Sequence, residues 1–200
     1  MTAAAGLAGL FCVAAAVAAG AGLEGYSHRI HPLGLLGADA VPGALAFNIA
    51  GFILPGLLAA LVALGLYRTL PAQAGWLPRI GARILLLSAL AFAAQGVFSL
   101  DPTDVDGPGS GLHAAAWLAW WVAFAAGAPL LAVGMPRIRL VTGVAVVMLL
   151  AMMFIPAALL EPPIAQRIAL AAWLLWLPAT LAGTDRRRGP GSYKVSRGAA

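Results

Sequence analysis

The ionisable side chains that could carry out chemistry gather in one polar stretch, Gly96 to His113, which separates two long apolar segments. A carboxylate and an imidazole within hydrogen-bonding reach of each other can work as an acid/base pair, and both groups are frequent zinc ligands. The stretch supplies both, because it contains aspartates and ends on a histidine. Asp101 and His113 are therefore the candidate catalytic residues, and their separation is the geometric test.

The surroundings of these two residues leave two interpretations open for each. Asp101 is expected at the carboxyl end of a helix, where the helix dipole disfavours an anion by up to about 1 kcal/mol. Either a cation or a donor then stabilises the carboxylate, or it forms an Asx-type turn before Pro102. If Ser110 caps the next helix, His113 lies in the first turn as a neutral imidazole that can accept a proton or bind a metal. The alternative is a boundary histidine that bonds a loop carbonyl.

A second polar stretch, Glu24 to Asp39, holds the other two histidines, His28 and His31. Their spacing would place them on one helical face, but Pro32 disfavours helical angles at His31. The pair alone is a weak metal signal, so a site needs ligands from the other loop as well. The candidate metal ligands are His28, His31, His113 and Asp101. Such a set suits zinc or a similar ion, which is the candidate cofactor.

Two amides and a tryptophan lie within the apolar segments near the same loops. Asn48 is about six residues, or roughly 9 Å, below the expected end of its helix, and Gln95 is about five residues below the end of the next. An amide in hydrocarbon is costly without partners, so both should face the bundle interior. Trp117 is typical of the aromatic belt at a membrane surface, or could stack against a lipid. These three are candidate ligand-binding residues.

The composition places these residues in a membrane protein. Of the 200 residues, 62% are hydrophobic and 10% are charged, whereas soluble proteins have about 25% charged residues. The apolar segments are long enough to cross about 30 Å of hydrocarbon as helices, and they do not alternate as the strands of a barrel would. We predict an all-α, polytopic membrane protein with six transmembrane helices, at about 5–23, 42–66, 81–100, 112–134, 139–160 and 163–183. Prolines are expected inside several of them, at Pro55, Pro129, Pro156 and Pro178.

The basic residues predict the orientation of these helices. Most fall in two connectors and the tail, on one side of the six spans: Arg68, Arg79, Arg83, Arg137, Arg139 and the Lys and Arg residues after 185. Positively charged connectors stay in the cytoplasm, so both termini are predicted inside and the Gly96–His113 loop extracytoplasmic. Only Arg29 and Arg167 fall on the other side. This placement explains the net charge of +5 without a nucleic-acid-binding face.

The chain is expected to form one six-helix domain over 1–184, followed by a basic cytoplasmic tail over 185–200 that is disordered and touches anionic lipid. The first apolar segment ends in small residues, which is also typical of a signal peptide. No Lys or Arg precedes it, so we expect it to be retained as a helix. Its cysteine, Cys12, is the single one in the sequence, which excludes an intramolecular disulfide.

Several short motifs lie in the first four segments: Tyr26-Ser27-His28, Leu33-Gly34, Pro42, Phe47-Asn48, Pro55-Gly56, and Gly96-Val97-Phe98 followed by Asp101 and His113. In these motifs the chain resembles a prokaryotic membrane family called domain of unknown function 998 (DUF998). The resemblance implies a six-helix membrane protein and singles out Asn48, Asp101 and His113. Tyr26, from the first motif, joins the candidate ligand-binding residues. The resemblance implies no activity, since none is assigned to the family.

Three functions are compatible with these features. The one we favour is a bacterial inner-membrane protein whose extracytoplasmic polar pocket binds a lipid or small amphiphile. The alternative is a membrane-embedded hydrolase or transferase acting on a lipid, either metal-dependent or with Asp101 and His113 as acid and base. A small transporter is the third, disfavoured because the inner halves of the spans hold almost nothing ionisable. Whether the protein is an enzyme stays open, and its expected partners are membrane lipids and further copies of itself.

Overall fold

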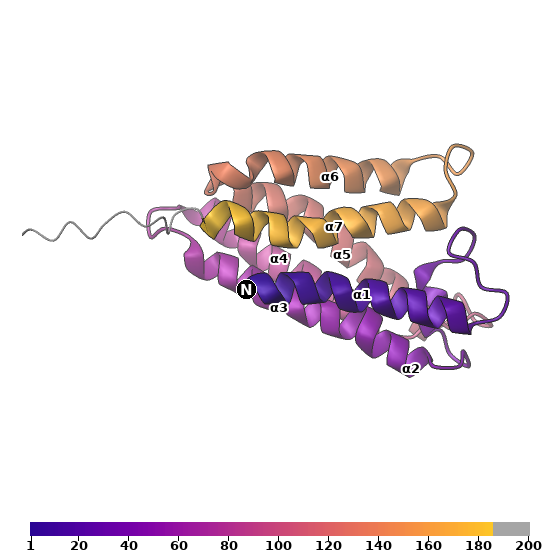
Figure 1. Ribbon diagram of the computed structural model, residues 1–200. Coiled ribbons are helices and arrows are strands. Elements are labelled where there is room, and N and C mark those ends of the chain that lie inside the picture. The colour runs from indigo at the N-terminus through magenta and orange to yellow at the C-terminus, as the bar shows by residue number, and fades with distance from the viewer. Residues whose placement is uncertain (186–200) are drawn as a thin grey trace, which may run out of the picture.

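The computed structural model describes the backbone of residues 1–185 and the side chains of residues 1–182. Helices in this part of the chain lie side by side in one bundle, and it contains no strand (Figure 1). In the described part of the chain, six helical segments are long and apolar enough to cross a membrane: α1 (Thr2–Gly22), Ala44–Thr69, α4 (Trp76–Ala94), α5 (Pro108–Val133), Pro136–Phe154 and Pro162–Ala182, which belongs to α7 (Pro162–Asp185). The prediction of an all-α chain with six membrane-length helices is confirmed. The predicted tail lies outside the described residues from 186 onward.

The connectors divide between the two ends of the bundle (Figure 1). Residues 23–43, 95–107 and 155–161 lie at one end, which we call the polar end. Residues 70–75 and 134–138 lie at the other, the basic end. Helix α1 packs against α3 (Leu54–Thr69) and α7, while α6 (Arg139–Phe154) packs against α5 and α7. All three histidines and the candidate site residues therefore belong to the polar end or to the helical turns beside it.

Two helices end earlier than predicted. Helix α4 ends at Ala94, not at 100, because the chain turns at Gly96, whose N–H bonds to Ala93 O at 3.0 Å. Helix α6 ends at Phe154 because Ile155 precedes a proline and is extended, with φ −64° and ψ 131°. Pro156 is therefore not inside a helix, and the prediction of an interior proline there is wrong.

Helix α5 begins at Pro108, a residue whose missing N–H suits the first turn of a helix. Its N-cap is Gly107, and no side chain caps it. The expectation that Ser110 caps this helix is therefore wrong: Ser110 lies inside the first turn, and His113 lies in the second. The hydroxyl of Ser110 instead bonds the preceding loop, accepting from the N–H of Asp101 at 3.0 Å and lying 2.9 Å from the carbonyl of Asp104.

The second span changes helix type near the polar end. Between α2 (Ala44–Phe47) and α3, residues Asn48–Ile53 form a π-helix, in which the N–H of Leu54 bonds to the carbonyl of Ile49, five residues back. The following residue, Pro55, has no N–H to donate. Short π-helical segments are frequent at functional sites, and here the segment begins at the candidate residue Asn48.

The bundle is held by close helix approach and by an aromatic core. Gly81 of α4 and Gly127 of α5 face each other so closely that a Cβ atom on Gly81 would lie 2.7 Å from the carbonyl oxygen of Gly127. Nearer the polar end, the ring of Phe92 lies 5.5 Å from Phe52, 5.5 Å from Trp120 and 4.7 Å from Trp173. Because these rings come from four different spans, the core fixes α4, α5 and α7 relative to the π-helix.

Candidate functional site

The turn that follows α4 brings three of the candidate residues together. Asn48 donates from Nδ2 to the carbonyl of Gly37 at 2.9 Å and to the hydroxyl of Ser99 at 3.3 Å. His113 places Nδ1 3.1 Å from the carbonyl oxygen of Gln95 and 2.9 Å from that of Phe98. Two carbonyls can only accept, so Nδ1 carries a proton, and in the neutral ring the lone pair is then on Nε2. We call Asn48, Gln95, Ser99 and His113 the turn cluster.

The turn cluster is closely packed. Asn48 is 4% exposed and Gln95 1%, so both amides face the bundle interior as predicted. A Cβ atom on Gly34 would lie 2.9 Å from Nε2 of His113, and one on Gly37 would collide with Oδ1 of Asn48. The prediction that Gln95 lies five residues inside its helix is wrong, since it directly follows the last residue of α4. Its buried Nε2 has no hydrogen-bond partner within the described part of the chain.

The carboxylate of Asp101 is bonded within its own loop. Oδ1 accepts from the N–H of Thr103 at 2.8 Å and from its hydroxyl at 2.7 Å, which is the Asx-type turn. These bonds to Thr103 lower the pKa of the Asp101 carboxyl. The expected position at a helix carboxyl end is wrong, because α4 has already ended at Ala94. Within the described residues no hydrogen bond joins Asp101 to His113, so their catalytic role stays a prediction.

A second cluster surrounds a guanidinium on α7. Nη2 of Arg167 donates to the hydroxyl of Tyr26 at 2.6 Å, lies 3.3 Å from Nδ1 of His28, and donates to the carbonyl of His31 at 3.2 Å. Nη1 donates to the carbonyl of Pro163 at 2.8 Å. The ring of Tyr26 stacks on His31 at 5.5 Å and meets His28 edge-on at 5.0 Å. We call Tyr26, His28, His31 and Arg167 the arginine cluster.

The arginine cluster determines which tautomers its histidines adopt. A guanidinium can only donate, so Nδ1 of His28 accepts and the ring is neutral. Burial, and the positive charge of Arg167, lower the pKa of His28. Burial also raises the pKa of Tyr26, against the opposing effect of Arg167. In His31, Nδ1 accepts from the N–H of Ser27 at 3.0 Å.

This geometry does not fit the proposed metal ligands. A neutral imidazole has one acceptor nitrogen, and in both His28 and His31 that nitrogen already receives a hydrogen bond. The lone pair of His113 faces the backbone at Gly34. Among the described residues, no three His, Cys, Asp or Glu side chains are grouped so that they could hold an ion. Zinc binding by His28, His31, His113 and Asp101 would therefore require these side chains to rearrange.

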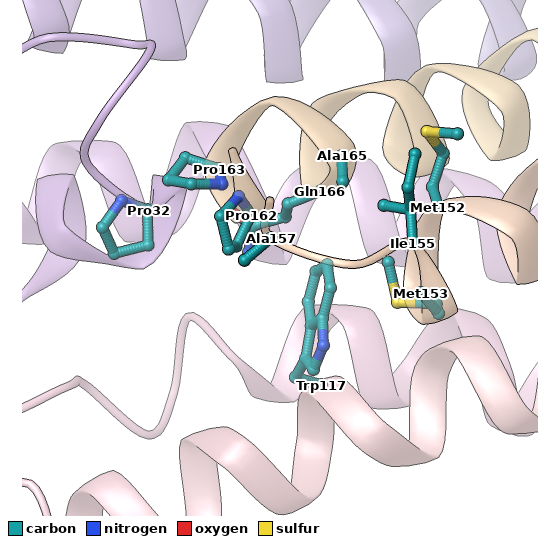
Figure 2. A pocket seen from close by; sticks show the side chains of 10 residues that line it. All are labelled: Pro32, Trp117, Met152, Met153, Ile155, Ala157, Pro162, Pro163, Ala165 and Gln166. Carbon is teal, nitrogen blue, oxygen red and sulfur yellow. The ribbon is translucent and has the colours of Figure 1, made fainter. Parts of the chain in front are cut away.

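A cleft of about 490 Å³ lies between α5, α6 and α7 at the polar end. Figure 2 shows Trp117 reaching from α5 toward the α6–α7 connector, with Met152 and Met153 of α6 on one side. Pro162, Pro163 and Gln166 of α7 and Pro32 of the first loop also line the cleft, as does Ala157 of the α6–α7 connector. Of the candidate ligand-binding residues, Trp117 thus lines a cleft, Tyr26 lies in the arginine cluster, and Asn48 and Gln95 lie in the turn cluster.

The cleft and the arginine cluster are joined by neighbouring residues of α7, Gln166 and Arg167, which are not among the site residues predicted from the sequence. Gln166 lines the cleft, and its Oε1 accepts from the N–H of Leu33 at 3.1 Å, which fastens the first loop to α7. Arg167 follows it directly and bonds the carbonyl of Pro163, another lining residue. A signal was present in the sequence, because Arg167 is one of two basic residues that depart from the charge pattern of the connectors.

Comparison with known proteins gives one match. The family model described as "Protein of unknown function (DUF998)" matches residues 6–183, which is most of the chain. No curated protein and no solved structure matches the chain.

Proposed function

The chain belongs to the DUF998 family, whose function is unknown, and on that premise we propose that it binds a lipid or another small amphiphile in the cleft between α5, α6 and α7. The observation that carries the proposal is an apolar cleft of about 490 Å³ at the polar end of a membrane-length bundle. Its volume lies within the range of about 300–1,000 Å³ that is typical of small-molecule sites.

The lining of the cleft supports an amphiphilic ligand. Met152 and Met153 have flexible thioether side chains that adapt to irregular apolar ligands. Trp117 is amphipathic and half-buried, as are tryptophans that lie where lipid chains meet headgroups. An occupant could therefore keep its apolar part against α5 and α6 and its polar part near the connectors of the polar end.

The proposal includes an orientation: the polar end faces the extracytoplasmic side of a bacterial cell membrane, and both termini face the cytoplasm. Support comes from the basic end, which carries Arg79, Arg137 and Arg139, because positively charged connectors stay in the cytoplasm. A cysteine introduced as Asp104→Cys should react with a membrane-impermeant maleimide in intact cells, while Cys12, buried in α1, should not. Labelling of Asp104→Cys only after lysis would reverse the orientation.

The buried hydroxyl groups favour binding over transport, because they are hydrogen-bonded within the protein. Ser88 donates to the carbonyl of Trp120 at 2.8 Å, and Thr180 donates to that of Leu177 at 2.8 Å. Thr142 accepts from the indole N–H of Trp176 at 3.0 Å. These groups are satisfied inside the protein, so they offer little to a polar solute crossing the bundle.

Native mass spectrometry of the protein, purified in mild detergent, tests the proposal. Ala157 lines the cleft from an exposed position, so Ala157→Trp should fill the space without disturbing the core. Ala158→Trp is the matched control, because Ala158 is equally exposed and is not among the residues that line the cleft. We expect wild type and Ala158→Trp to retain a bound lipid and Ala157→Trp to lose it. Equal lipid retention by all three proteins would refute the site.

A further inference from the structure

We infer that the amphiphile is an anionic, phosphate-bearing lipid whose headgroup is held by Arg167 while its chain occupies the cleft. This inference rests on the proposed function and adds the chemistry that selects the ligand. It is carried by three observations on the arginine cluster: its uncompensated charge, its position beside the cleft, and the hydrogen-bond donors left in it.

The first observation is the charge. Arg167 is half-buried, and its hydrogen bonds go to a phenol, an imidazole and two carbonyls, all of them neutral. In the described part of the chain the ion pair is a different one, in which exposed Arg29 binds Glu161 at 2.8 Å. A partly buried cation is normally compensated by an anion, so the arginine cluster lacks the partner that a phosphate would supply.

The second observation is the position of the guanidinium. Nη1 bonds the carbonyl of Pro163, and Nη2 bonds the carbonyl of His31, the residue before Pro32. Pro32 and Pro163 both line the cleft (Figure 2). The guanidinium is therefore bonded to the backbone of one lining residue, Pro163, and of the residue before another, Pro32. A lipid whose chain lies along Trp117 would bring its headgroup to this edge of the cleft.

The third observation is the remaining donor capacity. A guanidinium has five N–H groups in a planar fork that matches the oxygens of a phosphate. In the arginine cluster the fork is already oriented by its bonds to Tyr26 and to two loop carbonyls. The hydroxyl of Tyr26 accepts from Arg167, so its own proton is free to bond a second phosphate oxygen. Little ordering would then be needed when a headgroup binds.

The same cluster argues against a cationic or zwitterionic headgroup. An ammonium needs a carboxylate or an aromatic cage, and the arginine cluster contains no carboxylate. The acidic residue of the neighbouring connector, Glu161, is already engaged by Arg29. The positive charge of Arg167 would repel an ammonium held at the same place. An anionic phospholipid such as phosphatidylglycerol has the required phosphate without that positive group.

A competition experiment tests this inference. Wild-type protein in mild detergent is titrated with phosphatidylglycerol, with diacylglycerol, which has the chains but no phosphate, and with inorganic phosphate, and native mass spectrometry records the bound species. We expect roughly tenfold or greater preference for phosphatidylglycerol over diacylglycerol, from charge-assisted hydrogen bonds to one phosphate. Arg167→Gln should abolish that preference while diacylglycerol still binds.

Matched variants keep the outcome interpretable. Arg29→Gln removes one positive charge from the same end of the bundle and should leave the preference unchanged. Arg167→Lys keeps the charge without the fork and should give an intermediate preference, which covers the case in which Arg167→Gln does not fold. Tyr26→Phe keeps the ring that stacks on His31 and should reduce the preference in part.

Each contrary result has a separate meaning. Equal binding of phosphatidylglycerol and diacylglycerol, both lost in Ala157→Trp, would overturn the role of Arg167 and leave the cleft proposal intact. Retention of both lipids by Ala157→Trp would overturn the cleft proposal itself. If inorganic phosphate displaces phosphatidylglycerol and binds as tightly, the assignment to a lipid would be overturned, because the acyl chains would then contribute nothing to the affinity.

Discussion

The turn cluster and the arginine cluster lie at the same end of the bundle and differ in charge and in what surrounds them. The turn cluster contains no arginine, lysine or carboxylate; its His113 and Asn48 side chains are pressed against the backbone at Gly34 and Gly37 and bonded to carbonyls. The arginine cluster contains a cation bonded to neutral groups and borders a cleft. The comparison teaches that a buried polar residue in a membrane helix often serves to join a loop to the bundle. A charged side chain without an ion-pair partner, next to a cleft, is the better indication of a ligand site.

The largest effect is expected on breaking the turn cluster. Asn48→Ala removes the buried donor to Gly37 and leaves that carbonyl unpaired, so the free energy of unfolding should fall by about 2 kcal/mol. Lipid retention by the folded variant should not change. Ser99→Ala, which removes only the 3.3 Å contact, is the control and should cost much less. Chemical denaturation in detergent micelles measures both. Lipid loss in Asn48→Ala without loss of stability would transfer the site to the turn cluster.

A smaller effect on the free energy of unfolding, an increase, is expected on replacing Gln95. Its buried Nε2 has no hydrogen-bond partner in the described structure, and an unsatisfied donor costs about 1–3 kcal/mol. Gln95→Leu should therefore raise the free energy of unfolding, by about 1 kcal/mol. Gln166→Leu, which removes the acceptor of the Leu33 N–H, should instead lower it. If Gln95→Leu destabilises the protein, the amide has a polar partner, and the turn cluster would have to be reconsidered as a binding site.

Acid should weaken the arginine cluster. The pKa of His28 is lowered in the folded protein by burial and by the positive charge of Arg167. The unfolded chain therefore binds the proton more readily, so stability should fall as the pH drops below about 6.5, the value of an unperturbed histidine. Thermal unfolding midpoints of wild type and His28→Asn, compared at about pH 7.5 and pH 5.5, measure this. An identical pH dependence in both proteins would contradict it.

The smallest effect is expected at Asp101. The side-chain oxygen of asparagine can still accept from the N–H of Thr103, so Asp101→Asn should preserve the turn and leave the unfolding midpoint unchanged. Lipid retention should also match wild type, because the Asp101 carboxylate bonds Thr103 and Asp101 is not among the residues that line the cleft. A specific loss of lipid in this variant would restore Asp101 as a site residue.

Helix boundaries show where local sequence reasoning loses accuracy. The apolar run that ends at Leu100 is predicted to be helical throughout, but α4 ends at Ala94 and the run continues through a turn in which Gln95 and Gly96 are buried and Val97 is exposed. Hydrophobicity alone does not tell an apolar turn from the helix before it. The predicted helix 139–160 is too long for another reason: Ile155 precedes a proline and is extended, so α6 ends at Phe154.

The sequence by itself determined that six segments would be helices of membrane length, and that Asn48 and Gln95 would turn inward. Both follow from local properties, because an unsatisfied backbone or an amide in hydrocarbon is costly wherever it lies. Only the tertiary structure decided the partners of the histidines and the wall of the cleft. Tyr26 and Arg167 are 141 positions apart in the chain, and hydrogen bonds depend on directions and distances that exist only after the helices have packed.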